Sequence, residues 1–560
     1  MKGSRVMQAD MILTGARVLT MDKAQPRAEA VAIAGGKIIA VGTVAEVAAL
    51  AGPATRVIEA KGRTLLPGFV ESHLHLGLGG SELVQLQLGG VCGFDAVKAA
   101  FAGYAAQNPD APVLMAQGAG YECLGAPATR VLLDQIIADR PIAMMAPDHH
   151  TLWANTAALQ ASGLLYEAAM PPGHEVVIGR DGTATGELRE FEAFGPVIAL
   201  AGLKRLNLGI ATGAEPGPTT PQERAEDKAH FLRGLSHCAA HGITSMVNMD
   251  GNRYTLELLA ELSADGLLGA RVVVPFHMKP QMAMAELERA SAMDRDFRGE
   301  WVRSGFVKMF MDGVVDSRTA FMLRDYPGLP GHRSVPLFEA DRFKAICAEI
   351  DRRGLQIAVH AIGDGAVRQV IDGYEAARLR NGVRDSRHRI EHIELIDKAD
   401  IPRIGALGIT ASVQPPHPPG AMDFPLEPTM STSIGRDRWD DAYLCKTLKD
   451  HGAPLAFASD WPVSDVSVMR GIQAALTRKA YEGGVDQRVG LMEVLHAYTA
   501  GGAWAAKLEG VTGTLRVGLA ADLVLIDGDI EVIAPTDMGG TGIALTVAGG
   551  RITHQMPGIP

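Results

Sequence analysis

The stretch Leu65-Leu66-Pro67-Gly68-Phe69-Val70-Glu71-Ser72-His73-Leu74-His75 decides the fold that we predict for this chain. Its apolar first part is typical of a buried strand, and it ends in two histidines that lie two residues apart. Side chains two positions apart on a strand point to the same side. His73 and His75 are therefore predicted to place two imidazoles on one metal ion at the end of a strand.

The chain beyond His75 alternates short apolar runs with amphipathic patterns, which is typical of parallel strands joined by helices. Eight strands are predicted, at residues 66–73, 242–249, 271–277, 304–310, 355–360, 388–393, 408–414 and 454–460. Eight such units indicate an α/β protein with a (β/α)8 TIM barrel.

The distribution of these signals predicts three domains. About 165 residues separate the first two strands and carry their own strand and helix signals, so we predict an inserted cap domain at 77–235. Both ends of the chain contain short strands, and neither end is long enough to form a stable sheet alone. We therefore predict one β-sandwich from 1–64 and 505–560, with the barrel formed by 65–76 and 236–504.

Composition excludes several classes of protein. The net charge is −11, and no basic stripe is present, which argues against nucleic-acid binding. No window approaches about 18 uninterrupted apolar residues, so we expect no membrane span, and the N-terminus lacks an apolar signal core. The five cysteines are scattered and odd in number, which favours reduced thiols. We expect a cytoplasmic protein.

Barrel enzymes carry their catalytic groups at the C-terminal ends of the strands. Those positions hold metal-ligand or acid–base side chains here: His73, His75, Lys308, His360, His392 and Asp460, with Asp312 just behind Lys308. A single histidine at a strand end is more often a packing residue. Metal-ligand or acid–base side chains at the ends of five of the eight predicted strands are much less likely to occur by chance than a single one. They converge on one site only if the strands form a barrel.

Lys308 lies within the apolar segment Ser304-Gly305-Phe306-Val307-Lys308-Met309-Phe310, where an unpaired charge is costly. One interpretation is an ion pair with Asp312 on the same face. The other, which we favour, is that desolvation lowers the pKa of the amine, and that the neutral amine takes up carbon dioxide as a carbamate bridging two metal ions.

Other polar residues have simpler interpretations. Asp460 follows the small residues Ala456 and Ala458 on its face, although an aspartate there could also cap the next helix. His237 and His241 have a spacing that can bind metal on a helix, but they lie at the wrong end of their unit. We interpret both as packing or surface residues, and we place His388 below the metal layer.

Together these motifs resemble the amidohydrolase superfamily, and within it the amidohydrolase-3 branch, which is YtcJ-like and includes N-substituted formamide deformylases. The matching segments run from end to end of the chain: 67–75, 307–313, 359–364, 389–392 and 459–463, with 148–155 and 182–188 in the predicted cap and 513–525 near the C-terminus. The set is specific for the family and says little about the substrate.

The resemblance implies two zinc ions, with Mn²⁺ or Fe²⁺ as alternatives. His73, His75, Asp460 and a Lys308 carbamate formed from CO2 would hold one ion, and Lys308, His360 and His392 the other. It further implies hydrolysis of a non-peptide C–N amide bond in a small molecule by metal-activated hydroxide, with Asp460 as general base and acid. A homo-oligomer, dimeric or larger, is expected as well.

The residues predicted to contact the substrate are His150, Asn155, Asp312 and Trp461. The chain departs from its relatives at His149, where many carry glycine, and at Val314-Val315-Asp316. The alternatives that remain open are a deaminase, a hydrolase of carbamates, lactams or esters, an enzyme with one metal ion, and a non-catalytic scaffold.

Overall fold

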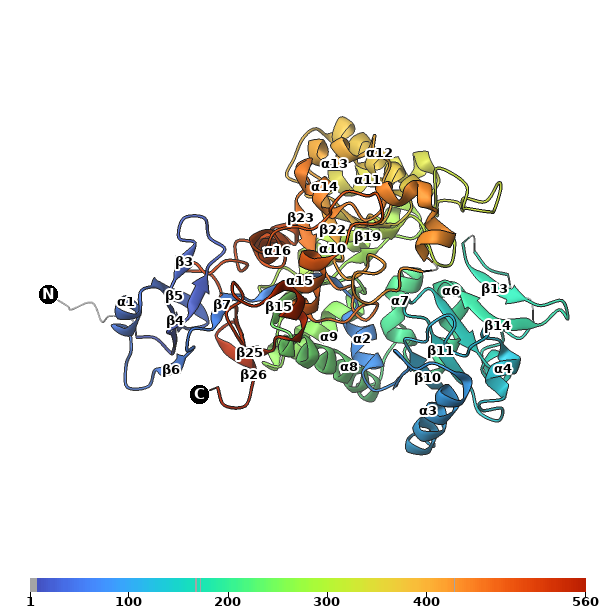
Figure 1. Cartoon of the computed structure of the whole chain (residues 1–560), viewed down its shortest axis with the longest axis horizontal. Helices are drawn as coiled ribbons and strands as arrows, with labels where there is room; N and C mark the ends of the chain where they lie inside the picture. Colours follow the sequence, from blue (N-terminus) through green and yellow to red (C-terminus); the bar gives the residue numbers. More distant parts are fainter. Residues whose placement is uncertain (1–7, 167–168, 172, 428, 560) are drawn as a thin grey trace.

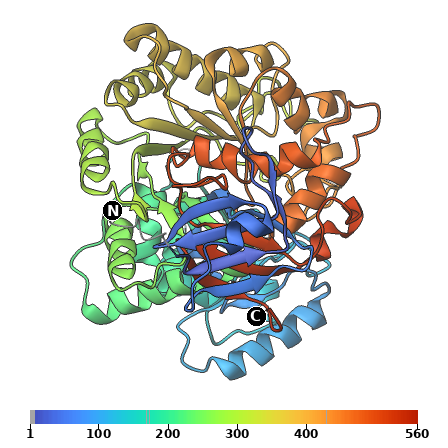
Figure 2. The ribbon, with the colours of Figure 1, turned by 90° about the vertical axis from the view of Figure 1, so that its left-hand side faces the viewer.

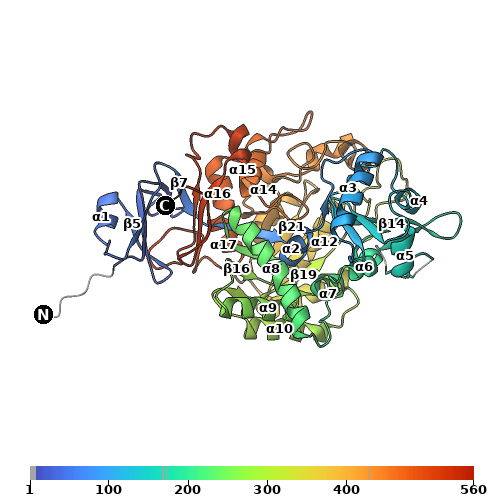
Figure 3. The ribbon, with the colours of Figure 1, turned by 90° about the horizontal axis from the view of Figure 1, so that it is seen from below.

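The computed structural model describes residues 8–166, 169–171, 173–427 and 429–559. Three parts follow one another along the long axis of the molecule (Figure 1). The strands of the two termini lie at one end, the parallel strands and their helices lie in the middle, and the segment that follows the first parallel strand lies at the other end. Figure 3 shows the same order from below.

The middle part is built from parallel strands in two sheets. The first sheet has the order β18-β16-β15-β8, and the second β17-β19-β20-β21-β22-β23. All eight pairings within them are parallel. The strands are β8 (Phe69–Leu74), β15 (Ile243–Asn248), β16 (Arg271–Val273), β17 (Phe276–His277), β18 (Val302–Arg303), β19 (Phe306–Phe310), β20 (Gln356–Ala361), β21 (Arg389–His392), β22 (Thr410–Val413) and β23 (Leu455–Phe457).

Each predicted parallel-strand segment contains an observed strand, and the third is divided into β16 and β17. These two strands belong to different sheets although only two residues separate them. The other edges of the two sheets are formed by β8 and β23. Near them, the Asp460 amide donates to the His73 carbonyl at 2.9 Å, and the His75 amide donates to the Trp461 carbonyl at 2.8 Å. The end of β8 therefore lies beside the segment that follows β23. Closure of all the strands into one barrel stays a prediction.

The first predicted strand was too long at its start. Leu66 and Pro67, the first two residues of the predicted strand 66–73, belong to a separate strand, β7 (Thr64–Pro67), which pairs with the C-terminal strand β24 (Leu523–Ile526). The chain passes from that sheet to β8 at Gly68, where a Cβ atom would lie 2.2 Å from Thr244 Oγ1. A continuous apolar run cannot reveal such a division, because both strands are buried.

Helices cover the parallel sheets and bury the largest hydrophobic core of the molecule. They are α2 (Leu76–Glu82), α7 (Lys204–Thr212), α8 (Pro221–Ala240), α9 (Arg253–Ala264), α10 (Leu287–Asp296), α11 (Ala340–Arg352), α12 (Asp364–Asn381), α13 (Ile401–Leu407), α14 (Cys445–Asp450), α15 (Val468–Thr477), α16 (Leu491–Ala497) and α17 (Ala500–Ala505). Among the described residues, no helix is both long enough and apolar enough to cross a membrane.

The segment between β8 and α7 forms its own mixed sheet in the order β13-β14-β12-β11-β10-β9. The strands are β9 (Leu86–Gln87), β10 (Leu114–Gln117), β11 (Ile142–Met145), β12 (Thr151–Ala154), β13 (Glu175–Ile178) and β14 (Ala184–Arg189). The helices α3 (Phe94–Gln107), α4 (Arg130–Asp134), α5 (Thr156–Ala161) and α6 (Phe191–Leu200) pack on it around two separate hydrophobic cores.

The two ends of the chain share one pair of sheets (Figure 2). One sheet has the order β5-β4-β1-β6, and the other, β26-β25-β24-β7-β2-β3, mixes N-terminal with C-terminal strands. The remaining elements are β1 (Met11–Thr14), β2 (Arg17–Leu19), β3 (Arg27–Ala28), β4 (Ala30–Ala34), β5 (Lys37–Gly42), α1 (Val44–Ala48), β6 (Arg56–Glu59), β25 (Ile543–Ala548) and β26 (Arg551–Gln555). Their shared hydrophobic core contains residues from both ends of the sequence.

A buried ion pair joins this terminal part to the parallel sheet. Arg271, at the start of β16, donates from Nε to Asp522 Oδ2 at 2.7 Å and from Nη2 to Asp522 Oδ1 at 3.2 Å. Arg271 has a second carboxylate partner, Glu300 at 3.1 Å, whose side chain is 43% exposed, so loss of Asp522 removes the buried partner and its two hydrogen bonds. We expect Asp522→Ala to lower the free energy of unfolding by up to about 3–5 kcal/mol.

Urea denaturation measures this effect. The matched control is Asp527→Ala, which removes a partly exposed pair with Arg63 in the same sheet region and should cost at most about 1 kcal/mol. Equal losses in the two variants would contradict a structural role for the Arg271–Asp522 pair.

Candidate metal centre

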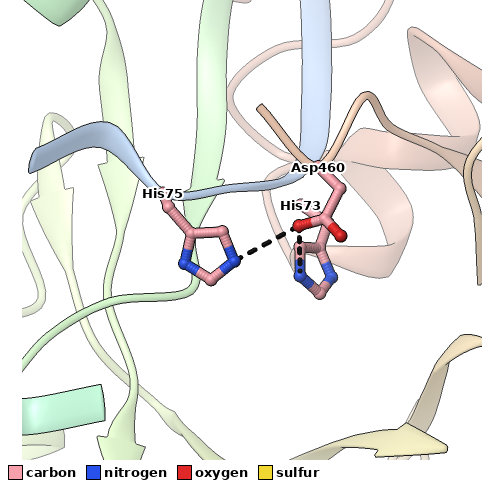
Figure 4. Close-up of side chains that lie close together, drawn as sticks. All are labelled: His73, His75 and Asp460. Carbon is pink, nitrogen blue, oxygen red and sulfur yellow. Dashed lines mark ion pairs between the residues drawn. The ribbon is translucent and has the colours of Figure 1, made fainter. Parts of the chain in front are cut away.

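His73 and His75 lie at the C-terminal end of β8 and point toward the carboxylate of Asp460 (Figure 4). The Nε2 atoms of both histidines are 3.2 Å from Asp460 Oδ1. Asp460 has a φ of +61°, a backbone conformation that side chains other than glycine rarely adopt and that is often found at functional sites. The two strand ends therefore converge on one point, as the sequence predicts.

The other ring nitrogen of each histidine is held by a second carboxylate. His73 Nδ1 lies 2.7 Å from Glu391 Oε2, and His75 Nδ1 lies 2.6 Å from Asp250 Oδ1. Because an ionised carboxylate only accepts hydrogen bonds, both Nδ1 atoms donate, and in neutral imidazoles the lone pairs are then on Nε2. This fixed tautomer is the arrangement that metal-binding histidines usually have.

Three acceptor atoms consequently face one another: His73 Nε2, His75 Nε2 and Asp460 Oδ1. Among the described residues this buried oxygen has no hydrogen-bond donor, although two imidazole nitrogens are close. Two nitrogen lone pairs and a carboxylate oxygen repel one another unless a cation lies between them. The donor set, two imidazoles and one carboxylate, is one that Zn²⁺ prefers, so these residues fit a divalent metal ion.

Lys308 lies on β19 and is fully buried. Its Nζ has no acceptor in the described part of the chain, and it lies 4.9 Å from the centre of the Phe310 ring. Burial lowers the pKa of the amine to about 8. The alternative of an ion pair with Asp312 has no support, because that carboxylate instead accepts the backbone amides of Phe321, Ile362 and Gly363 at 2.9–3.1 Å.

His360 and His392 complete the group. The rings of these two histidines lie 4.5 Å apart, and the His392 ring lies 4.9 Å from that of His73. His360 Nε2 donates to the carbonyl of Gly313 at 3.0 Å, and His392 Nδ1 lies 2.9 Å from Gln414 Oε1. In each ring one nitrogen is held by the protein and the other is left for a ligand.

All six predicted ligands line one cavity that is open to solvent. They are His73, His75, Lys308, His360, His392 and Asp460. The cap contributes Asp148, His149 and His150 to the same wall. His150 lies 5.7 Å from the His360 ring, centre to centre, and its Nδ1 is 2.6 Å from Glu190 Oε2. Of the predicted substrate contacts, His150 is thus placed in the cavity.

The other three predicted substrate contacts do not line this cavity. Asn155 caps α5: its Oδ1 accepts from Ala158, and its amide donates to two backbone carbonyls. Asp312 binds three backbone amides, as described above. Trp461 packs against His237 with the ring centres 5.3 Å apart. These side chains position the backbone around the cavity, a role that residue type alone does not distinguish from substrate contact.

The remaining histidines lie outside the cluster. His237 and His241 meet edge to face near the end of α8, with ring centres 4.9 Å apart, and belong to no metal-binding group among the described residues. His388, directly before β21, accepts a hydrogen bond from the Ile357 amide and contacts Asp351. Both interpretations from the sequence agree with these positions.

His417 is not among the predicted site residues, and it lines the cavity beyond the end of β22. Its ring is parallel to that of His392 at 6.3 Å, and its Nε2 is buried without a partner among the described residues. With His392 and Asp460 it forms a second group that could hold a metal ion. The signal was present, because the strand-end rule extended into the loop after the seventh predicted strand leads to this residue.

Comparison with known proteins agrees with this geometry. The sequence model of the amidohydrolase family matches residues 56–554. The chain belongs to the amidohydrolase family. This confirms the resemblance to the amidohydrolase-3 branch and places the chain among metal-dependent hydrolases. The "Putative amidohydrolase YtcJ" of Bacillus subtilis is 27% identical over 97% of this chain and 98% of its own length.

Two further relatives align along almost the whole chain. "Protein LONG AFTER FAR-RED 3" of Arabidopsis thaliana is 26% identical over 97% of this chain and 91% of its own. The N-substituted formamide deformylase of Arthrobacter pascens is 24% identical over 98% of this chain and 99% of its own length. At 24–26% identity these relatives leave the substrate of this chain open.

Solved structures share the fold. A metal-dependent hydrolase from Pyrococcus horikoshii superposes with a TM-score of 0.73 at 23% identity, covering 94% of this chain and 99% of its own. An adenosine deaminase from Xanthomonas campestris with bound zinc superposes with a TM-score of 0.55 at 13% identity, covering 99% of this chain and 95% of its own. The chain therefore has the α/β fold of metal-dependent hydrolases.

The contact between Asp250 and His75 gives a direct test of the metal centre. Loss of a carboxylate that orients a ligand histidine typically weakens metal binding about 10- to 100-fold. We expect Asp250→Asn to show that loss in a zinc competition titration against a chelator. Asp265→Asn, a matched change at an exposed helix end, should bind zinc as the parent does; equal affinities in the two variants would contradict the role of Asp250.

Proposed function

We propose that this protein is a metal-dependent hydrolase that cleaves a non-peptide C–N amide bond of a small molecule. One observation carries the proposal: two imidazole nitrogens meet a carboxylate oxygen of Asp460 beside the buried Lys308, and within the described part of the chain neither that oxygen nor the Lys308 Nζ has a hydrogen-bond partner. The barrel is taken to be closed at the contact between the end of β8 and the segment after β23.

In this proposal His73, His75, Asp460 and carbamylated Lys308 hold one zinc ion. Lys308, His360 and His392 hold the second, with Mn²⁺ or Fe²⁺ as possible replacements. The carbamate forms when neutral Nζ bonds to the carbon of CO2 and loses a proton. The absence of an acceptor for Nζ among the described residues supports this step. The bare amine has no partner there, whereas the carboxylate of a carbamate could bind the metal ions.

When bound, such a metal pair lowers the pKa of a coordinated water to about 7 and polarises a carbonyl oxygen. Asp460 accepts the proton of the attacking water and passes it to the leaving nitrogen, which is general base and then general acid catalysis. Its position between His73 and His75 leaves the carboxylate close to the point of attack. Glu391 and Asp250 keep the two imidazoles in the required orientation.

Residues of the cap line the substrate side of the cavity. His150, fixed by Glu190, lies beside His360 and contacts the substrate in our proposal. Val314, Val315 and Asp316 line the same cavity and set the shape of the substrate that fits. We further propose that the enzyme acts in the cytoplasm as a homo-oligomer.

Metal analysis combined with a product assay tests the proposal. We expect close to two transition-metal ions per chain, loss of amide hydrolysis after dialysis against a chelator, and recovery when zinc or manganese is added. N-acyl amines, aryl amides and carbamates should be screened with separate detection of amine, carboxylate and ammonia. A protein that binds no transition metal would end the proposal, and release of ammonia alone would replace hydrolysis of an amide with deamination.

A further inference from the structure

His417 lies in a rigid loop at the end of a barrel strand. The loop, Gln414-Pro415-Pro416-His417-Pro418-Pro419, follows β22 and places two prolines on each side of the histidine. The ring of a proline fixes its φ near −65°, so this backbone has little freedom. The His417 amide donates to the Gln414 carbonyl at 3.1 Å, and the loop is buried as far as Pro419. The position of the His417 side chain is therefore set by its own backbone.

The Nε2 atom of His417 is buried and has no hydrogen-bond partner among the described residues. The ring meets Phe424 edge to face, with the ring centres 5.3 Å apart. It also approaches the backbone of Ser459, without a hydrogen bond of ordinary geometry. Buried polar side-chain atoms in native proteins nearly always have a partner, and an unsatisfied one is costly. Packing against Phe424 does not satisfy a nitrogen, so we expect a partner from outside the protein at Nε2.

The neighbours of His417 indicate that this partner is a metal ion. One ligand atom from each of His392, His417 and Asp460 lies within 4.8 Å of the other two. The rings of His392 and His417 are parallel, with their centres 6.3 Å apart. Two imidazoles and a carboxylate are ligands that zinc and other first-row transition metals prefer.

The carboxylate of Asp460 lies between two such groups of potential ligands. Its Oδ1 is 3.2 Å from the Nε2 atoms of His73 and His75, whereas its Oδ2 is 3.8 Å from His392 Nδ1. Asp460 belongs to both groups, and each of its oxygens faces a different one. This arrangement suits a pair of ions about 3.5–4 Å apart, as in two-metal hydrolases.

We propose that His417 is a ligand of the second metal ion, the one that His392 holds. The inference rests on the proposed function, in which Lys308 and His360 are the other ligands of that ion. Because Gln414 binds one nitrogen of His392, only the other nitrogen is left for a metal. The ion that His392 shares with His417 is therefore the second ion of the pair. An additional imidazole favours zinc or iron over Mg²⁺ and Ca²⁺, which prefer oxygen ligands.

Titration of the chelator-treated protein with Zn²⁺, in competition with a chromophoric chelator, tests the proposal. Loss of a residue that only orients a metal ligand weakens metal binding about 10- to 100-fold, so loss of a direct ligand should cost at least about tenfold. We expect His417→Ala to weaken one of two zinc-binding steps by at least that factor and to leave the other unchanged. His75→Ala should weaken the other step, which assigns each step to its ion.

The matched control is His451→Ala, the same change at an exposed histidine that follows α14 and contacts the Thr447 carbonyl of that helix. Both of its zinc-binding steps should match those of the parent. Equal zinc affinities in the parent and His417→Ala would overturn the proposal, whatever happens to substrate affinity.

If His417→Ala fails to fold, anomalous diffraction at the zinc edge from crystals of the zinc-loaded parent decides. The second ion should lie about 2.0–2.1 Å from Nε2 of His417. An ion outside bonding range of that nitrogen would overturn the proposal equally.

Zinc binding is measured without substrate, so its outcome is separate from that of the amide assay. A protein that loses one zinc-binding step in His417→Ala but hydrolyses no amide keeps His417 as a ligand and refutes the proposed reaction. A protein that hydrolyses an amide, and whose zinc affinity does not depend on His417, refutes this inference alone. Absence of zinc binding refutes both.

Discussion

Replacement of Lys308 by alanine is expected to reduce kcat at least about a hundredfold and to lower the metal content of the purified protein. The reason is its position: Nζ is buried in the wall of the cavity beside His360 and His392 and has no acceptor among the described residues. Burial lowers the pKa of the amine to about 8, so roughly one amine in five is neutral near pH 7.4, compared with about one in a thousand for an ordinary lysine. Only the neutral amine forms a carbamate.

Chemical rescue makes this result specific. Formate or acetate fits the space left by the lysine and supplies the carboxylate that the carbamate would provide, so activity and metal content should recover in part. Lys279→Ala is the matched control, because Lys279 is also close to the Phe310 ring but binds the Ile210 carbonyl instead of lining the cavity. Unchanged activity of Lys308→Ala would remove the carbamate from the mechanism, and a loss without rescue would assign Lys308 a structural role.

Asp460→Asn is expected to lower kcat by about 10²- to 10⁴-fold, the usual contribution of a general acid–base group. Asp460 Oδ1 lies 3.2 Å from the Nε2 atoms of His73 and His75 and accepts no hydrogen bond from the described residues. An aspartate is ordinarily ionised at neutral pH, so this carboxylate can accept a proton. An amide of the same shape cannot do so.

The measurement separates two contributions. Metal content and kcat are determined on the same sample at saturating zinc, so that weaker binding is corrected before the rates are compared. Asp465→Asn, an exposed aspartate five residues further along, is the control and should retain full activity. Full activity of zinc-saturated Asp460→Asn would exclude Asp460 as the proton carrier.

Much of the parallel sheet was predictable because its signals are local. Each of the predicted parallel segments contains an observed strand, since an apolar run bounded by turns is a property of neighbouring residues. The division between β7 and β8 was not predictable. Both strands are apolar, and their separation depends on which distant strand each one pairs with, β24 in one case and β15 in the other.

The same distinction applies to the candidate site. The ligand types at the strand ends, His73, His75, Lys308, His360, His392 and Asp460, could be identified from the sequence because the ends of parallel strands gather at one edge. Their partners could not. Asp250 and Gln414 follow β15 and β22, but residue type does not show which imidazole each one contacts. The side chain of Asn155, which resembled a substrate contact, binds the backbone of its own domain.

The sequence by itself determined the alternation of strands and helices, the two-residue spacing of His73 and His75, and the family to which those residues belong. The tertiary structure alone decided which nitrogen of each imidazole is free and that Lys308 has no acceptor among the described residues. The physical reason is that residue type and periodicity act over a few positions. Hydrogen bonding and the cost of a buried charge depend on atoms brought together from segments hundreds of residues apart.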